Sequence, residues 1–255
     1  MFIQYASDLH LEFPDNKEFM KLNPLQPFGD VLLLAGDIVP FSVMDKHSDF
    51  FNYISENFKE TYWVPGNHEY YGFDLAKKSG IIHEKIKHNV HLVNNLTVNY
   101  GDVSFIFSTL WSKISPINEW SIQKNINDFH AIRYQNARLL TKQFNILHDE
   151  SLNFISSELS KKAGAKSIVV THHVPTLMNY PQQYKGDPLT EAFAVELFDL
   201  IEKIGPDYWI YGHHHQNTPD FDIGKTQMLT NQLGYVKYGE HLHFKFSNGI
   251  KNFNI

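Results

Sequence analysis

Several short runs of apolar residues in this chain end abruptly at a glycine or a polar residue. The clearest is Val31–Ala35, in which every residue is apolar and which Gly36 follows at once. A strand that is apolar at every position is typical of one buried on both faces, as in a sheet covered by further layers on each side. The pattern therefore predicts packed β-sheets, with the residues after each run at the edge of a sheet.

The apolar runs alternate with stretches of helical spacing, and together they predict the order of the elements. Strands are predicted at residues 2–6, 31–35, 62–64, 98–100, 103–107, 167–171, 208–211, 227–230 and 242–246, the fourth and fifth forming a hairpin. Helices are predicted at residues 50–58, 73–87, 140–159 and 193–204, with Gly164 ending the third. This order indicates an α/β (α+β layered) fold of two packed mixed β-sheets with helices outside them.

Composition limits the class of protein. At 255 residues the chain fits one domain spanning residues 1–255. Its net charge of −6 provides no overall attraction for nucleic acid, so a stable nucleic-acid partner is not expected. The absence of cysteine excludes disulfides and thiolate metal sites. Residues 1–6 do not resemble a signal peptide, and no apolar run is long enough to cross a membrane, so a cytoplasmic protein is expected.

Residues 111–135 show no clean period and are expected to form an irregular, lid-like insert. Long irregular stretches in compact domains are usually lids or binding loops. Arg133 in this stretch could clamp a substrate phosphate through two hydrogen bonds, although a surface arginine explains it equally well. Trp111, Trp120 and His130 could stack on a ring of the substrate, or could simply pack within the protein.

Five short polar motifs follow five of the predicted strands, at the edge where α/β sheets commonly bind ligands. Taken singly, each has an ordinary explanation, since Asp37 could cap a helix and the Gly66-Asn67 pair could form a turn. Packing explains the three consecutive histidines 213–215 less readily than a single one. The informative observation is that all five occur together. They are Asp8-Leu9-His10, Gly36-Asp37, Gly66-Asn67-His68-Glu69, Thr171-His172-His173 and Gly212-His213-His214-His215.

This set of motifs resembles the pattern of the calcineurin-like metallophosphoesterase superfamily. The family pattern is D-x-H, then G-D, then G-N-H-[DE], then a histidine after a strand, then G-H-x-H. The chain has DLH, GD, GNHE, THH and GHHH in the same order, from Asp8 to His215. The resemblance implies a four-layer sandwich and an enzyme that hydrolyses phosphate esters with two divalent metal ions.

The resemblance also implies which side chains hold the two ions. One metal would be bound by Asp8, His10, Asp37 and His215. The other would be bound by Asp37, Asn67, His172 and His213, so that Asp37 bridges the two. Imidazole and carboxylate ligands suit Mn, Fe, Zn or Co, and the sequence does not select among Mn, Fe and Zn. Two carboxylates against two dications leave a charge of about +2, which attracts phosphate and favours a hydroxide as the attacking group.

Neighbouring residues receive other roles from the same resemblance. His68 would lie near the leaving-group oxygen and donate a proton to it, the alternative being that it only orients its loop. The first histidine of the fourth motif is the ligand in the family, which favours His172 over His173, although an exchange between the two is possible. His173 and His214 are expected to support or pack around the site, and Glu69 to brace its loop.

The leading hypothesis is a two-metal phosphoesterase acting on mono- or diesters of a phosphorylated small molecule or nucleotide. A Ser/Thr-type protein phosphatase is the second enzymatic hypothesis, and the sequence lacks the additional arginine-bearing motifs of that branch. A non-catalytic scaffold of the same fold is a third, and it would not need every ligand position to be filled. Oligomeric state is not indicated by the sequence.

Overall fold

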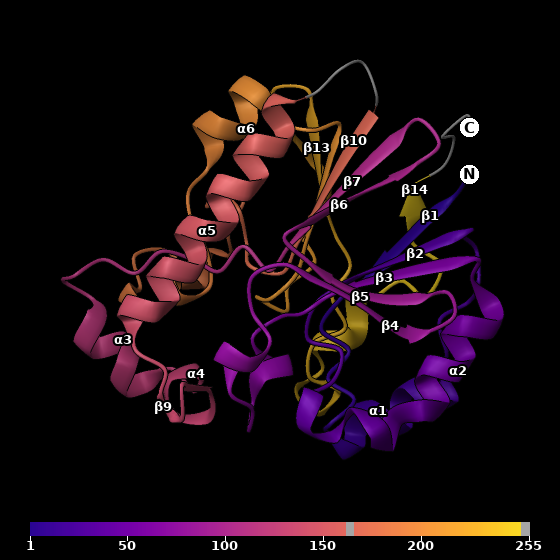
Figure 1. Cartoon of the computed structure of the whole chain (residues 1–255), viewed down its shortest axis with the longest axis horizontal. Helices are drawn as coiled ribbons and strands as arrows, with labels where there is room; N and C mark the ends of the chain where they lie inside the picture. The colour runs from indigo at the N-terminus through magenta and orange to yellow at the C-terminus, as the bar shows by residue number, and fades with distance from the viewer. Residues whose placement is uncertain (162–165, 251–255) are drawn as a thin grey trace.

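The structure, a computed structural model, describes residues 1–161 and 166–250, and its strands form two large sheets (Figure 1). The first sheet has the order β14-β1-β2-β3-β5-β4. Its strands are β1 (Ile3–Ala6), β2 (Val31–Ala35), β3 (Glu60–Val64), β4 (Ile82–Lys87), β5 (Val90–Asn94) and β14 (Gly249–Ile250). The second has the order β12-β13-β11-β10-β7-β6. Its strands are β6 (Leu96–Tyr100), β7 (Val103–Ser108), β10 (Lys166–Thr171), β11 (Tyr208–Tyr211), β12 (Phe221–Ile223) and β13 (Thr226–Thr230).

Helices cover the outer faces of both sheets. In Figure 1, α1 and α2 lie beside the first sheet and α5 and α6 beside the second. The helices are α1 (Pro14–Leu22), α2 (Ser48–Asn57), α3 (Glu119–Asn125), α4 (Asp128–Ala131), α5 (Thr141–Ser160) and α6 (Phe198–Ile204). A small hairpin of β8 (Arg133–Tyr134) and β9 (Ala137–Arg138) follows α4. The predicted fold of two packed mixed sheets flanked by helices is confirmed.

Three apolar layers account for the uninterrupted apolar strands. In β2, Leu32 and Leu34 pack outward against α1 and α2, whereas Val31, Leu33 and Ala35 pack inward between the two sheets. A third layer joins the second sheet to α5 and α6. Because successive side chains of a strand point to opposite faces, a strand with helices on one side and a sheet on the other has no position left for a polar residue.

The carboxyl ends of the central strands meet where the two sheets adjoin. Strands β1, β2 and β3 are parallel to one another in the first sheet, and β10 and β11 are parallel in the second. The main chain of Ser7, directly after β1, bonds to Asn231 and Leu233, directly after β13, at 3.0 and 3.1 Å. This contact places the loops that follow the strands of both sheets side by side.

One predicted helix is a strand. Residues 73–87 contain only a short 3₁₀ helix, Leu75–Lys77, and then the edge strand β4, which pairs antiparallel with β5. Ile82 and Ile86 both pack on the layer beneath α2. Residues four apart share a face in a strand as well as in a helix, so their spacing could not distinguish the two. Antiparallel pairing with β5, which begins at Val90 just after β4 ends at Lys87, decides the outcome.

Other boundaries also differ from the predictions. Residues 242–246 are not a strand: Glu240–His243 is a 3₁₀ helix, and Asn231 and Gln4 side chains satisfy the main chain of residues 245 and 246. The helix predicted at 193–204 begins only at Phe198. The stretch 111–135 is not wholly irregular, because it contains α3 and α4. Gly164 lies outside the described residues. None of the described helices has the length and apolar character to cross a bilayer.

Candidate metal centre

All five motifs begin where a central strand ends, and their chain conformation is unusual. Asp8, His10, Asp37, His213 and His215 have φ angles of 56°, 48°, 55°, 84° and 52°. Residues other than glycine rarely adopt positive φ, because this conformation strains the backbone. Such strained residues persist only where the surrounding structure holds them, and they are concentrated at functional sites. These loops therefore turn their side chains sharply away from the strand direction and toward one common point.

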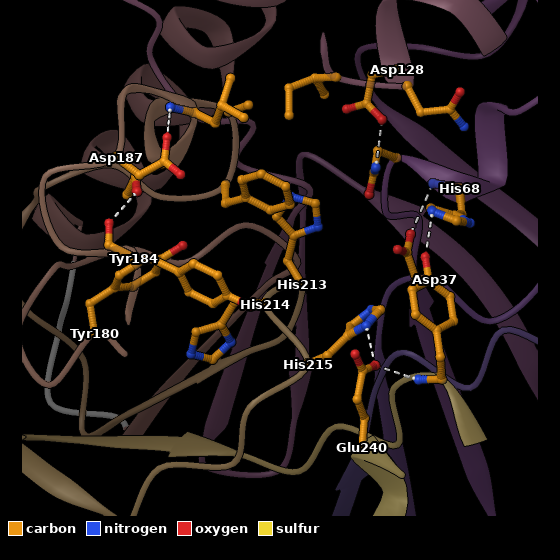
Figure 2. Close-up of a pocket in the computed structure, with 18 of the residues that line it drawn as sticks. Asp37, His68, Asp128, Tyr180, Tyr184, Asp187, His213, His214, His215 and Glu240 are labelled. Atoms are coloured by element: carbon orange, nitrogen blue, oxygen red, sulfur yellow. Dashed lines mark hydrogen bonds and ion pairs between the residues drawn. The ribbon is translucent and has the colours of Figure 1, made fainter. Parts of the chain in front are cut away.

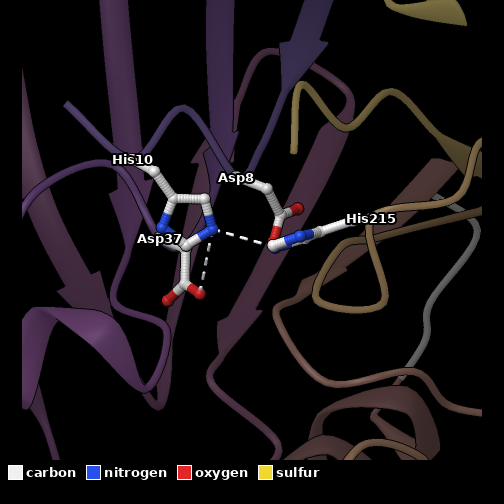
Figure 3. Close-up of side chains that lie close together, drawn as sticks. All are labelled: Asp8, His10, Asp37 and His215. Carbon is white, nitrogen blue, oxygen red and sulfur yellow. Dashed lines mark hydrogen bonds and ion pairs between the residues drawn. The ribbon is translucent and has the colours of Figure 1, made fainter. Parts of the chain in front are cut away.

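Four of these side chains form the first cluster (Figure 3). The Nε2 atoms of His10 and His215 lie 2.9 Å apart. Nε2 of His10 lies 3.7 Å from Oδ2 of Asp37, and Nε2 of His215 lies 3.5 Å from Oδ1 of Asp8. All four potential ligand atoms lie within 4.8 Å of one another. The cluster contains the residues that the sequence predicted for the first metal.

The second cluster is built around His172. Its Nε2 lies 3.4 Å from Oδ1 of Asp37, 3.0 Å from Oδ1 of Asn67 and 3.0 Å from Nδ1 of His213. All four residues are buried. Asp37 directs one carboxylate oxygen to each cluster, Oδ2 to His10 and Oδ1 to His172. This is the arrangement that a bridging carboxylate requires, so the predicted second set is also brought together.

The donor types of both clusters fit divalent cations. Each combines imidazole nitrogens with carboxylate oxygens, and the second adds an amide oxygen, a combination that suits first-row divalent ions. In each cluster two imidazole nitrogens face each other at about hydrogen-bond distance inside the protein. Such a pair needs either a shared proton or a cation between its nitrogens. A cation in each cluster would satisfy both nitrogens and the carboxylates together.

Two glycines allow these loops to approach closely. A Cβ atom on Gly66 would lie 2.2 Å from Oδ1 of Asp37 and 2.7 Å from Nε2 of His172. A Cβ atom on Gly36, which has a φ of 90°, would lie 2.3 Å from Nδ1 of His172. The glycines of the second and third motifs are therefore required by the space around the clusters.

Glu69 holds the second and third motifs together. Its buried carboxylate accepts hydrogen bonds from the main-chain N–H groups of Asp37, Ile38 and Gly66 at 3.0, 2.7 and 2.7 Å. It also accepts one from the indole of Trp63 at 3.1 Å. These contacts agree with the loop-bracing role predicted for Glu69, and they set the position of Asp37 between the clusters.

Three acidic residues that the sequence analysis did not identify contact the predicted site. Oε1 of Glu12 lies 2.9 Å from Nδ1 of His68 and 3.3 Å from Nδ1 of His10. Asp128 accepts a hydrogen bond of 2.8 Å from the side-chain amide of Asn67, which turns the amide oxygen toward His172. Oε2 of Glu240 lies 2.8 Å from Nδ1 of His215. Each acidic group thus orients a residue of the site.

Glu12 lies two residues after His10, and an alternating pattern could have indicated it. Asp128 lies in the stretch predicted as a lid, where other residues were the candidates, and Glu240 lies in a segment for which no site residue was predicted. Their contacts cross 61 and 25 residues of chain, respectively, so that no local pattern indicated them.

The electrostatic field among these side chains favours cations. Burial would lower the pKa of His172, but the Asp37 carboxylate outweighs it and raises the pKa to about 9. Burial would also lower the pKa of His215, but the carboxylates of Asp8 and Glu240 outweigh burial and raise this pKa to about 10. Burial would raise the pKa of Asp37, but His172 and His68 hold it well below its usual range. The Asp37 carboxylate is therefore ionised.

The remaining histidines of the motifs surround the clusters. The His173 ring is buried between His213 and Trp111, at 4.3 and 5.3 Å between ring centroids. Nδ1 of His214 lies 2.8 Å from the Gln232 amide. Both therefore lie around the clusters rather than within them, as expected from the sequence, and the geometry favours His172 over His173 as a ligand.

A cavity of about 400 Å³ opens beside the clusters (Figure 2). The labelled side chains in Figure 2 run from Tyr180 and Tyr184 at one end, past the histidines 213–215, to Asp37 and His68 at the other. The segment predicted as a lid contributes to the wall of the cavity. Its contribution comes from Ile126, Asn127 and Asp128.

The other candidates in this segment lie elsewhere. Arg133 is exposed in β8 and does not line the cavity, so its predicted role in phosphate binding has no support from the geometry. Trp111 packs in the core against Phe144. Trp120 is 72% exposed, and His130 is also exposed, so neither is positioned to stack on a ligand in this cavity.

Several known proteins are similar to this chain in sequence or in fold. The family model described as calcineurin-like phosphoesterase matches residues 5–217. An uncharacterised protein, L509 of Acanthamoeba polyphaga mimivirus, is 36% identical over 91% of this chain and 91% of its own length. Purple acid phosphatase 7 of Arabidopsis thaliana is 26% identical over 72% of this chain and 51% of its own length.

Two solved structures share the fold at low sequence identity. The phosphopantetheinyl hydrolase PptH of Mycobacterium tuberculosis superposes with a TM-score of 0.65 at 14% identity, over 92% of this chain and 90% of its own. A dimetal phosphatase of Danio rerio has a TM-score of 0.51 at 12% identity, over 91% of this chain and 87% of its own. The family match and the Asp–His clusters together indicate a metal-dependent phosphoesterase that uses divalent ions. The chain belongs to the calcineurin-like phosphoesterase family.

Proposed function

We propose that this protein hydrolyses phosphate mono- or diesters of small molecules or nucleotides at a two-metal centre. The observation that carries the proposal is the position of Asp37, whose two oxygens face two separate clusters of imidazole nitrogens. The first ion would be held by Asp8, His10, Asp37 and His215. The second would be held by Asp37, Asn67, His172 and His213. When bound, two such ions supply an activated water and neutralise charge on the phosphate oxygens.

His68 is the proposed proton donor to the leaving group. Its Nδ1 faces the Glu12 carboxylate at 2.9 Å, while its Nε2 lies 3.5 Å from the Tyr235 hydroxyl on the cavity side. The ring is held on its face by Tyr71, at 4.0 Å between ring centroids. Burial would lower the pKa of His68, but Asp37 and Glu12 outweigh it and raise the pKa above its usual value. A protonated imidazole directed at the cavity is suited to donate a proton.

The test is hydrolysis of p-nitrophenyl phosphate and bis(p-nitrophenyl) phosphate by protein loaded with Mn²⁺, Zn²⁺ or Fe²⁺, the metal content being measured in parallel. Turnover that disappears on chelation and returns on metal addition is expected. Asp37→Asn should abolish it, whereas Trp120→Ala, a change at an exposed side chain away from the cavity, should not. Absence of turnover with two ions bound would contradict the proposal and favour a scaffold.

The other hypotheses are distinguished by substrate. Hydrolysis of phosphoserine and phosphothreonine peptides at rates above those of small esters would favour the protein phosphatase. The relative named as a purple acid phosphatase agrees with phosphate ester chemistry in general. The predicted cytoplasmic location and the arrangement of residues 1–255 as one domain stay predictions.

A further inference from the structure

The cavity continues beyond the predicted metal ligands toward a cluster of aromatic rings. We propose that this far end is a subsite for a planar aromatic group, such as a nucleobase, carried by a phosphodiester with a single negative charge. This inference rests on the proposed function, because it takes the metal centre as the place where the phosphate binds. It specifies which esters the site should prefer.

The charge of the site favours a diester over a monoester. None of the lining residues in the described part of the chain is a lysine or an arginine. The positive charge near the phosphate would therefore come chiefly from the two ions. Asp8 and Asp37 offset half of the four charges of the ions, and Glu12 and Glu240, which contact His10 and His215, offset the rest. Because the carboxylates of Asp128 and Asp187 also line the cavity, little positive charge remains there to hold a second negative charge on the phosphate.

A phosphate monoester carries between one and two negative charges near neutral pH, whereas a diester carries only one. Enzymes that bind a terminal phosphate dianion commonly use arginine, whose planar group donates two parallel hydrogen bonds. No such group lines this cavity in the described residues. A phosphodiester needs no such group, because it carries one negative charge and its second substituent can occupy the far end of the cavity.

The far end has the chemistry of an aromatic subsite. Tyr180 is buried, with its ring stacked on His214 at 5.6 Å between centroids and tilted by 29°. Tyr184 lies 6.3 Å from Tyr180 and keeps 41% of its surface exposed. Phe193 stacks on His213 at 4.9 Å between ring centroids and also lines the cavity. Leu189 completes an apolar lining at this end.

These rings differ in what they contribute to folding. Phe193 and Tyr180 pack on histidines of the fifth motif, so their removal would disturb the site itself. Tyr184 lies in the short 3₁₀ helix Gln182–Tyr184, in which none of the residues is buried. An exposed aromatic side chain that lines a cavity and is not needed for packing is available to stack on a ligand. Tyr184 is therefore the residue at which the subsite can be tested without disturbing the clusters.

The experiment compares esters that share p-nitrophenolate as the leaving group. The substrates are p-nitrophenyl phosphate, methyl p-nitrophenyl phosphate and the p-nitrophenyl ester of thymidine 5′-monophosphate, assayed with the Mn²⁺-loaded full chain. Stacking of one base typically changes binding by about tenfold or more. We expect kcat/KM to be highest for the thymidine diester, about tenfold above the methyl diester, and lowest for the monoester.

The variant Tyr184→Ala should reduce the advantage of the thymidine ester over the methyl ester to about threefold or less, since one stacking partner is lost. Hydrolysis of the methyl ester and the metal content should not change. Trp120→Ala is the control, because it removes another exposed aromatic side chain, one that does not line the cavity. It should leave the thymidine advantage intact.

Two results would overturn the inference while leaving the proposed function intact. One is a kcat/KM for the monoester above that of both diesters. The other is a thymidine advantage that is absent, or that Tyr184→Ala does not reduce. Failure to hydrolyse any of the three esters, with two ions bound, would instead overturn the proposed function and the inference with it.

Discussion

The Nε2 atoms of His10 and His215 lie 2.9 Å apart, although 205 residues of chain separate them. His172 and His213 face each other in the same way at 3.0 Å. Two imidazole nitrogens this close would share a proton or converge on one cation, because two bare lone pairs would repel each other. The carboxylates of the two clusters add negative charge around both pairs. The two cation sites proposed above, joined by Asp37, would account for all of these contacts together.

Replacing the shared carboxylate should affect both sites. In Asp37→Asn the amide cannot offer an oxygen to each cluster, and its N–H₂ group would face an imidazole nitrogen of His10 or His172. We expect the bound metal to fall from two ions toward one or none, and turnover to fall by at least about a thousandfold. Metal content by mass spectrometry and turnover of bis(p-nitrophenyl) phosphate test this. Retention of two ions with normal rates would contradict the bridging role.

His68→Ala should separate metal binding from proton transfer. The variant should keep both ions and lose about 10²- to 10⁴-fold in kcat on alkyl phosphate esters, whose leaving groups need a proton. On p-nitrophenyl esters, whose leaving group departs without one, the loss should be less than about tenfold. His68→Gln keeps a polar group in the loop and serves as the control for loop orientation. An unchanged kcat on the alkyl esters would remove the proton-donor role.

Asp128 should control the second cluster through Asn67. In Asp128→Asn the charged acceptor of the Asn67 amide is lost, so the amide oxygen is less firmly held toward His172. The affinity for the second ion should weaken by about 10- to 100-fold, while the first is retained. Titration calorimetry measures the two sites separately. Tyr71→Phe removes only the other hydrogen bond to the same oxygen and should weaken binding less. Equal loss at both sites would argue against this role.

Gly66 should not tolerate a side chain. In Gly66→Ala the new Cβ would lie 2.2 Å from Oδ1 of Asp37, so the loops must separate. We expect about 1–3 kcal/mol of destabilisation and a loss of bound metal. Gly80→Ala is the control, because a Cβ there meets no atom within 4 Å although its φ is also positive, at 69°. That variant should lose a comparable or smaller amount of stability from backbone strain and keep its metal. Thermal unfolding and metal analysis distinguish the two.

Metal uptake should release protons. With carboxylates raising the pKa of His172 to about 9 and of His215 to about 10, both rings are protonated near neutral pH without metal. An ion must displace those protons, so the apparent affinity should increase with pH up to about 9 to 10. Without metal, the contacts of His172 and His215 with carboxylates stabilise the folded protein fully below the unfolded histidine pKa of about 6.5. This stabilisation is lost as the pH rises through the pKa values of the two rings in the folded protein. Calorimetry in buffers of different ionisation enthalpy counts the protons. An affinity independent of pH from 6.5 to 9 would contradict this prediction.

Local sequence patterns were sufficient to predict those strands and loops whose structure depends on neighbouring residues of the chain. The all-apolar run of β2 indicated a strand covered on both faces, and the polar motifs after the runs indicated loops at one edge. They were insufficient at β4, where an even spacing of isoleucines fits a helix and a strand alike and pairing with β5 decides. They were also insufficient at residues 242–246, where side chains of Gln4 and Asn231 take the place of a neighbouring strand.

The sequence by itself determined the strand-end loops and the residue types on them, because both follow from short-range alternation and from the chain's own order. Only the tertiary structure decided which loops touch. It joined β1 to β13 through Ser7, and it brought Glu12, Asp128 and Glu240 against the histidines and Asn67 of the site. The physical reason is that a hydrogen bond depends on distance in space, and residues far apart in the chain approach only after the apolar layers have packed the two sheets together.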